Sequence, residues 1–278
     1  MTQRIDTHHH FWRTAAQQQP WRGDAHAQLA ADFGPADLEP LLDEVGVDAT
    51  VLVESVDTAE ENDRLAAYAA DFERVAGVVG WLPLADPGAA RAELARADRG
   101  RWCGVRCLVG RDPLDWLSPD LMAQLAAEGL AWDVVPVTDA QVESVVTLAR
   151  LVPDLRIVVD HLARPPLDTG DLDAWAARLG ALAACENLAL KVSVGIDVLS
   201  SWAAWDATAL NPVVTRAVAA FGPQRLMLAS NWPVVTLRAD YATAMADLDS
   251  ALVASGVPAD GLAQVRCGTA MHWYRLEL

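Results

Sequence analysis

The sequence predicts an α/β fold, a single (β/α)8 TIM barrel that spans residues 1–278. Strand-like apolar runs alternate with helical patterns from end to end, and no linker or break in composition divides the chain. A length of 278 residues is ordinary for such a barrel. Runs such as 50–53 and 157–159 are continuously apolar, which is typical of parallel strands covered on both faces. A doubly wound open sheet is the alternative, although no Gly-x-Gly-x-x-Gly follows the first strand.

Eight strands are expected, each followed by a helix. The strands are predicted near 4–10, 48–55, 75–84, 102–109, 130–137, 156–162, 188–194 and 225–231. The helices are predicted near 36–45, 59–72, 88–98, 118–128, 139–151, 171–184, 207–220 and 239–255.

Several helix boundaries carry local signals. Ser118 is placed as an N-cap with Pro119 at the first helical position. Thr58 and Glu61 have the spacing of a capping box. Glycines stand at three predicted helix ends: Gly46, Gly129 and Gly222.

The composition limits the kinds of partner. Acidic residues outnumber basic ones by 38 to 21, and the formal charge of −17 disfavours nucleic acid. The apolar stretches fall short of a membrane span and no signal-peptide pattern follows Met1, so we expect a cytoplasmic protein without a membrane partner. The four cysteines form no Cys-x-x-Cys pair, and we expect Cys103 and Cys107 to be small core residues on one strand face. The sequence leaves open whether the chain forms a homo-oligomer.

The run Asp6-Thr7-His8-His9-His10 is the most informative motif. In a strand, Asp6, His8 and His10 would share one face and His9 would point the other way. Two adjacent imidazoles at a strand end suit either a divalent metal or acid–base chemistry. A histidine-rich start without a role is the alternative.

A polar residue stands at the carboxyl end of nearly every apolar run. Because catalytic residues of a barrel come from the carboxyl ends of its strands, these residues are candidates for a site. Burying such groups unpaired costs a few kcal/mol, so a cluster implies mutual pairing or a ligand. The residues are His8, His10, Glu54, Trp81, Arg106, Asp133, His161, Lys191, Ser193 and Asn231.

Some candidates have a structural alternative. Arg106 could pair with Glu54 inside the barrel, or it could bind a carboxylate or polarise a carbonyl. His161 could be a buried histidine bonded to Asp160, but strand alternation favours an imidazole that faces the barrel while Asp160 faces away.

For the single lysine and for three tryptophans, a structural role and a functional role are both open. Lys191 is the single lysine beside twenty arginines, which indicates either chance or a need for a compact ammonium group. Trp81 is expected to pack more than to bind substrate. Trp12 and Trp21, in the loop after the first strand, could cover a small ligand.

Five motifs in this order resemble the amidohydrolase superfamily. The resemblance is closest to its branch of sugar-lactone hydrolases (L-fuconolactonases and L-rhamnonolactonases) and pyrone-dicarboxylate lactone hydrolases, and it runs from about residue 4 to the Tyr274-Arg275-Leu276 tail. The motifs are His8-x-His10, Gly104-Val105-Arg106, Val159-Asp160-His161, Lys191-Val192-Ser193 and Ser230-Asn231-Trp232-Pro233.

The resemblance implies a lactone hydrolase with a small-molecule substrate. Arg106, Lys191 and His161 would stabilise charge on the carbonyl oxygen. Glu54, Trp81 and Trp21, singled out from their positions in the chain, are the further candidates for substrate binding. His8 and His10 would bind substrate directly, with no cofactor, or hold one divalent metal such as zinc.

One position departs from the family pattern. Family members have an aspartate where this chain has Asn231, and the resemblance gives that aspartate the role of general base. A carboxamide cannot take up that proton, so we expect activity to be reduced or abolished. An introduced substitution, a natural homologue with another base, and a repurposed member all remain open. The alternative functions are a metal-dependent non-oxidative decarboxylase and a catalytically impaired ligand-binding homologue.

Overall fold

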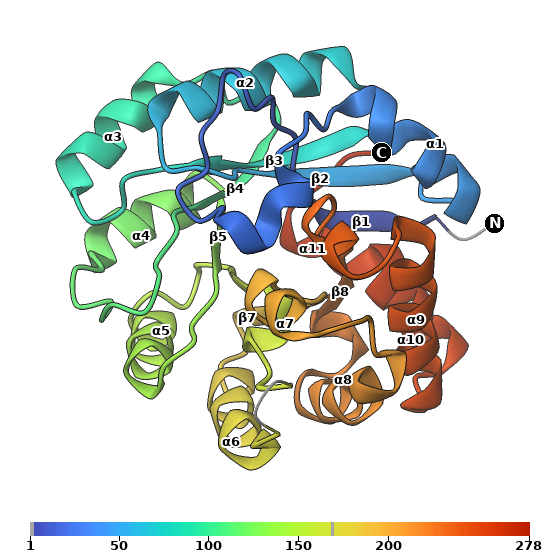
Figure 1. Cartoon of the computed structure of the whole chain (residues 1–278). Coiled ribbons are helices and arrows are strands. Elements are labelled where there is room, and N and C mark those ends of the chain that lie inside the picture. The colour runs from blue at the N-terminus through green and yellow to red at the C-terminus, as the bar shows by residue number, and fades with distance from the viewer. Residues whose placement is uncertain (1–2, 168–169) are drawn as a thin grey trace.

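A computed structural model of the chain, which describes residues 3–167 and 170–278, confirms the predicted barrel (Figure 1). Eight parallel strands are neighbours in chain order. The strands are β1 (Ile5–His9), β2 (Ala49–Val53), β3 (Val75–Trp81), β4 (Trp102–Arg106), β5 (Ala131–Val134), β6 (Ile157–Val159), β7 (Leu188–Val192) and β8 (Leu226–Leu228). All eight predicted strands are present, and each ends one to three residues earlier than predicted.

The helices cover the outside of the barrel. The eight predicted ones are α1 (Pro35–Val45), α2 (Ala59–Asp71), α3 (Pro87–Arg96), α4 (Pro119–Ala127), α5 (Asp139–Leu151), α6 (Leu172–Ala183), α8 (Ala207–Phe221) and α9 (Tyr241–Ala254). Three short helices were not predicted, because they are too short to show a clear periodicity: α7 (Ile196–Ser201), α10 (Ala259–Ala263) and α11 (Thr269–Trp273). Among the described residues, no helix is both long enough and apolar enough to cross a bilayer.

The local helix signals are mostly confirmed. The Ser118 hydroxyl caps α4 at the backbone N–H of Leu121, with Pro119 in the first turn. Glycines with positive φ follow α1, α4 and α8. The capping box at Thr58 is wrong, since its side chain makes no capping hydrogen bond.

The barrel closes between β1 and β8 beyond the regular ladder. The backbone N–H of Asn231 donates to the His8 carbonyl at 2.8 Å, and the N–H of His10 donates to the Trp232 carbonyl at 2.8 Å. His8, His10 and Asn231, which the sequence proposes for the site, therefore also take part in closing the barrel.

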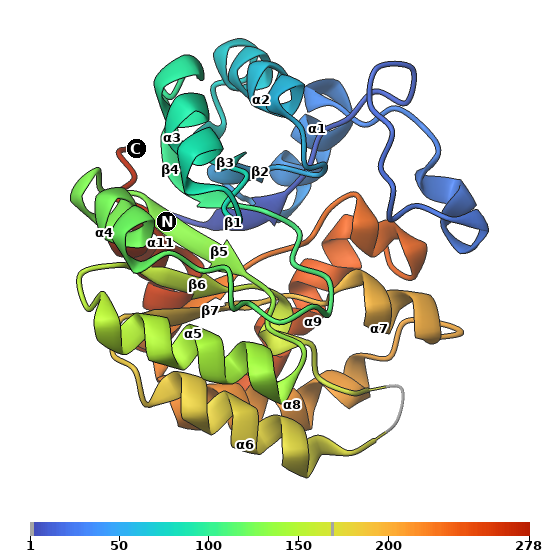
Figure 2. The same ribbon diagram turned by 90° about the vertical axis from the view of Figure 1, so that its left-hand side faces the viewer.

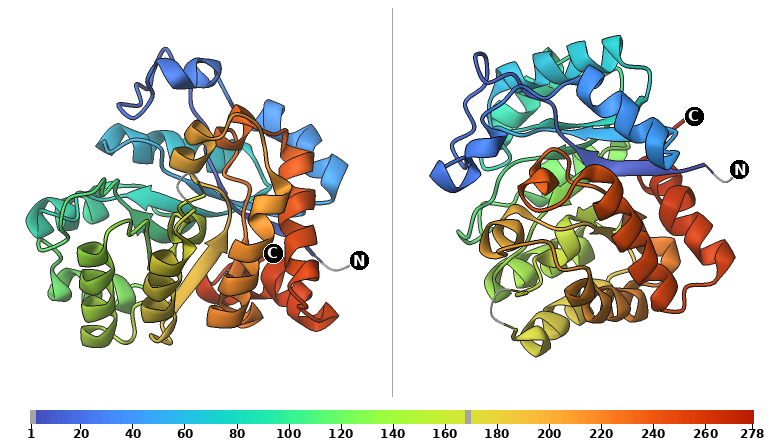
Figure 3. Two further views of the ribbon diagram at one scale, coloured as in Figure 1. Left: turned by 60° about the horizontal axis from the view of Figure 1, so that its bottom comes forward. Right: turned by 45° about the vertical axis from the view of Figure 1, so that its right-hand side comes forward.

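The opposite end of the barrel is filled by the C-terminal segment. Trp273, Tyr274 and Leu276 join the apolar side chains of the barrel interior, among them Val79 and Met227. Figure 2 shows both termini at this end, and the loop that follows β1 together with α7 at the other. Figure 3 shows the same two segments projecting on one side, where the imidazole of His26 and the hydroxyl of Ser200 are 2.9 Å apart.

A bulge in β1 corrects one prediction. The register between β1 and β2 shifts between Asp6 and His9. As a result Asp6 does not share a face with His8; its carboxylate instead accepts hydrogen bonds from Ser230 and from Tyr241 of α9. His8 and His10 do lie together, with their Nε2 atoms 3.2 Å apart, and His9 faces the other way toward Thr50.

His9 gives a prediction about stability. Its ring is buried, and burial lowers its pKa to about 3, against roughly 6.5 in an unfolded chain. Between these values the unfolded chain binds more protons, so the contribution of His9 to stability falls as the pH falls. In His9→Gln, which keeps a partner for Thr50, this loss is removed. As the pH falls from 7.5 to 5, we expect the unfolding free energy of the wild type to decrease by about 2 kcal/mol more than that of the variant. Urea titrations at both pH values measure it, and an offset independent of pH would contradict it.

Candidate active site at the barrel mouth

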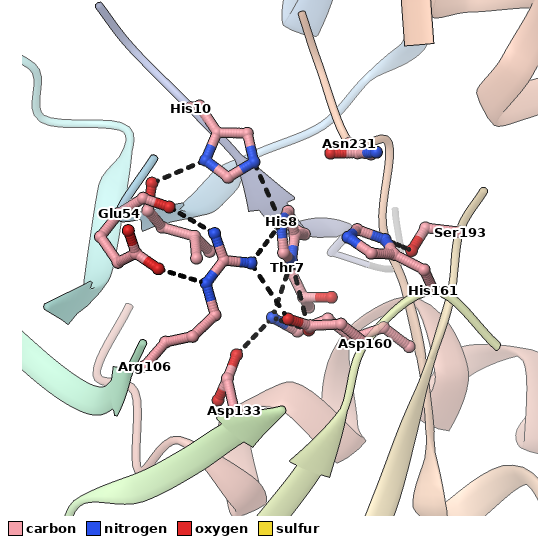
Figure 4. Close-up of polar contacts among 12 residues, drawn as sticks. Thr7, His8, His10, Glu54, Arg106, Asp133, Asp160, His161, Ser193 and Asn231 are labelled. Atoms are coloured by element: carbon pink, nitrogen blue, oxygen red, sulfur yellow. Dashed lines mark hydrogen bonds and ion pairs between the residues drawn. The ribbon is translucent and has the colours of Figure 1, made fainter. Parts of the chain in front are cut away.

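A cluster of buried charged and imidazole side chains fills the carboxyl end of the barrel (Figure 4). Arg106, at the end of β4, binds Glu54 Oε1 through Nε at 2.6 Å and Asp160 Oδ2 through Nη1 at 3.2 Å. Lys191 of β7 binds Asp133 at 2.6 Å and Asp160 at 3.0 Å. Asp160 therefore lies between two cations.

The charges of this cluster follow from its pairing. Burial opposes ionisation of Asp160, but the charge of Lys191 holds the pKa of its carboxyl well below its usual range. Burial also opposes the charge of Lys191, yet Asp133 and Asp160 raise its pKa. Burial raises the pKa of Asp133 to about 6. The two cations thus stay charged at neutral pH because carboxylates face them.

The three imidazoles of the mouth are neutral at pH 7. Burial lowers the pKa of His8 and of His10 well below the usual range of histidine. Burial likewise lowers the pKa of His161 to about 4. Neutral imidazoles carry a lone pair, which suits them to accept a proton or to bind a metal.

Hydrogen bonds orient the imidazole pair on β1. His10 Nδ1 is 2.8 Å from the Val53 carbonyl, which accepts only, so Nδ1 carries the proton and Nε2 the lone pair. The Nε2 atom of His8 lies 3.2 Å from that nitrogen and 3.4 Å from Nη1 of Arg106. The Nδ1 atom of His8 lies 3.2 Å from Lys191 Nζ and 3.3 Å from the carboxylate of Asp160.

His161 is presented by the turn that follows β6. The chain leaves the strand with a positive φ at His161, so His161 and Asp160 both reach the mouth. The prediction that Asp160 faces away from the barrel is therefore wrong. The Nδ1 atom of His161 is 2.8 Å from the Ser193 hydroxyl, and Gly195 lies against the ring, where an added Cβ would come within 3.3 Å of the His161 Cβ.

A cavity of about 270 Å³ opens above this cluster. It is lined by some of the residues singled out from the sequence: His10, Trp21, Arg106, His161 and Asn231. The ring of Trp21 is fixed by a 2.8 Å hydrogen bond from Nε1 to the Ser55 carbonyl. The amide nitrogen of Asn231 donates to the Val194 carbonyl at 2.9 Å.

Other predicted site residues do not reach the cavity. His8, Glu54 and Lys191 are fully buried and are linked to the lining through His10 and Arg106. Trp81 is bound through its backbone to Asn62 and is not part of the lining.

The sequence misplaced Cys107 and gave no indication of the role of Tyr274. Cys107, expected in the core, lies beyond the end of β4 and lines the cavity. Tyr274 was not considered for the site at all, yet its phenol donates to Asp133 at 2.6 Å from the C-terminal segment. Its place in the Tyr274-Arg275-Leu276 tail, far along the chain from the strand ends, gave no signal of this contact.

Three residues of the cluster form a candidate metal site. His8, Asp160 and His161 each offer one ligand atom, these atoms lie within 4.8 Å of one another, and all three residues are buried. Two neutral imidazoles and a carboxylate are a donor set that zinc takes in catalytic sites, so the residues fit the metal in type and spacing. Lys191 competes for two of these donors, since it already contacts His8 and Asp160.

Zinc binding can be tested by thermal unfolding. A ligand that binds the folded state raises the melting temperature. We expect added zinc to raise the melting temperature of the wild type, and His161→Asn to remove most of that rise. His26→Asn is the matched control, because His26 lies outside the three-residue group. An equal rise in all three proteins would show that zinc binds elsewhere.

Comparisons with known proteins place this architecture in a family. The chain is 36% identical over 292 residues to an L-fucono-1,5-lactonase of Burkholderia ambifaria, with 100% of this chain and 97% of that protein covered. It is 33% identical over 261 residues to an L-fucono-1,5-lactonase of Burkholderia multivorans, with 86% and 84% covered.

A solved structure and a family model agree with these relatives. The crystal structure of an amidohydrolase from Burkholderia multivorans with bound zinc superimposes with a TM-score of 0.88 at 31% identity, over 99% of this chain and 100% of that one. The model of the family described as amidohydrolase matches residues 5–276. The chain is a member of the amidohydrolase family.

Proposed function

We propose that this protein hydrolyses the lactone ring of a sugar acid. The observation that carries the proposal is the full-length similarity to two L-fucono-1,5-lactonases, combined with a cavity that brings a charged guanidinium and neutral imidazoles together. Hydrolysis requires water to attack the ring carbonyl, which places negative charge on the carbonyl oxygen.

Arg106 is the group that stabilises this charge. It lines the cavity, and Glu54 and Asp160 fix its orientation from behind. A guanidinium held in this way requires little rearrangement as the oxyanion forms. Lys191 is fully buried, so we assign it a positioning role through His8 and Asp160. His161 lines the same cavity and contacts the substrate.

His10 is the proposed acceptor of the proton from water. Its Nδ1–H is held by the Val53 carbonyl, so the lone pair lies on Nε2. Asn231 also lines the cavity, and with its nitrogen bound to the Val194 carbonyl its oxygen can accept a hydrogen bond from the attacking water. A zinc ion at His8, Asp160 and His161 would supply Lewis-acid polarisation of the substrate carbonyl when bound.

The function is tested by supplying candidate lactones to the purified protein. Release of acid, followed with a pH indicator, supports hydrolysis. Formation of CO₂ from unsaturated or aromatic acids would instead indicate a decarboxylase, and binding without turnover would indicate a binding protein. Either of these results overturns the proposal.

The assignment of the base is tested by two variants. His10→Asn keeps a donor for Val53 but cannot accept the proton, and we expect a loss in kcat of about 10²–10⁴. Asn231→Asp would place a carboxylate oxygen against the Val194 carbonyl, and we expect no gain above tenfold. A gain of several orders of magnitude in Asn231→Asp, with little loss in His10→Asn, would move the role of base to position 231.

A further inference from the structure

The turn after β6 has an uncommon backbone. Four consecutive residues without a glycine have positive φ: His161, Leu162 and Ala163 at 53°, and Arg164 at 51°. This conformation costs an L-residue roughly 1–2 kcal/mol. Strain of this kind persists where the surrounding structure enforces it, and it is concentrated at functional sites.

Arg164 adds to this cost because Pro165 follows it. A residue before proline prefers an extended backbone, whereas Arg164 is held in the left-handed region. The turn is fixed from outside the barrel by the indole of Trp175, which donates to the Leu162 carbonyl at 2.9 Å. Its result is that His161 and Arg164 both line the cavity.

Arg164 is paired with a second cavity residue. Its Nε forms an ion pair with the carboxylate of Asp197, which lies in the first turn of α7 and also lines the cavity. The side chain of Asp197 is 52% exposed, so the pair contributes little to stability. Among the described residues, no partner binds the two Nη groups of Arg164 or the second carboxylate oxygen of Asp197.

The remaining wall of the cavity is apolar. It is formed by Leu108, Val109, Val135, Val137 and Ile196, with Trp21 beside them. A ligand that fills this cavity contacts His10 and Arg106. It also contacts the ion pair of Arg164 and Asp197, which come from the segments after β6 and β7. Because Asp197 neutralises Arg164, the pair suits neutral hydroxyl groups better than a carboxylate.

We propose that Arg164 and Asp197 bind adjacent hydroxyl groups of the substrate and make the site selective for polyhydroxylated lactones. The guanidinium donates to hydroxyl oxygens, and the carboxylate accepts from hydroxyl protons. This inference rests on the proposed lactone hydrolysis and names the part of the substrate that the site recognises. Arg164 and Asp197 determine specificity and take no part in proton transfer.

The test compares two lactones with the same ring size. L-Fucono-1,5-lactone carries ring hydroxyls, and δ-valerolactone carries none. We expect Arg164→Met and Asp197→Asn each to lower kcat/KM for the hydroxylated lactone about 10- to 100-fold, mostly through KM. For δ-valerolactone the change should stay within twofold. Asp197 is exposed, so its variant keeps the test valid if Arg164→Met disturbs the turn.

Arg216→Met is the matched control. Arg216 also faces an aspartate, Asp173 at 3.7 Å, but it lies on α8 and is not part of the cavity lining. An equal loss for both lactones in the Arg164 and Asp197 variants would overturn the inference and leave lactone hydrolysis intact. Failure of the wild type to open any lactone would overturn the function itself. If the wild type opens the hydroxylated lactone alone, a rise in KM supports the inference and a fall confined to kcat overturns it.

Discussion

The carboxylate of Asp160, held between Lys191 and Arg106, is the interaction on which the site depends. Both cations are buried, and Asp160 is a carboxylate that they share, in addition to Glu54 on Arg106 and Asp133 on Lys191. Removing one partner of a buried ion pair typically costs about 3–5 kcal/mol. The same carboxylate lies 3.3 Å from His8, so the cluster also fixes the imidazole pair on β1. The contacts that compensate these charges therefore also position the residues to which we assign catalytic roles.

This cluster is inseparable from the closure of the barrel. The backbone bonds between β1 and β8 run through His8, His10 and Asn231, so a shift of the seam would move three side chains of the mouth together. From the other end, Tyr274 reaches Asp133 through the barrel interior. The C-terminal segment thus seals the barrel and supports the ion pair of Lys191, which connects both ends of the fold to the site.

The sequence predicted the positions of site residues where the regular alternation of a strand holds, and it failed where a bulge or a turn interrupts that alternation. Residues at the ends of apolar runs could be found because parallel strands bring their carboxyl ends to one mouth. Asp6 was misplaced because a bulge interrupts the alternation on which its assignment relied. Asp160 was predicted to face away from the barrel, but the positive φ at His161 brings the side chains of both residues to the mouth. Arg164 and Asp197 lay outside the strand ends and gave no periodic signal.

The sequence by itself determined the class of fold and the order of its eight strand–helix units, because apolar runs and helix boundaries depend on residues that are close together in the chain. It also determined which chemical groups are available, including an amide at position 231. Only the tertiary structure decided which groups meet. Contacts such as Lys191 with Asp133 or Tyr274 with Asp133 join segments 58 and 141 residues apart. Their geometry depends on the closed barrel, because only its curvature brings such distant segments to one axis.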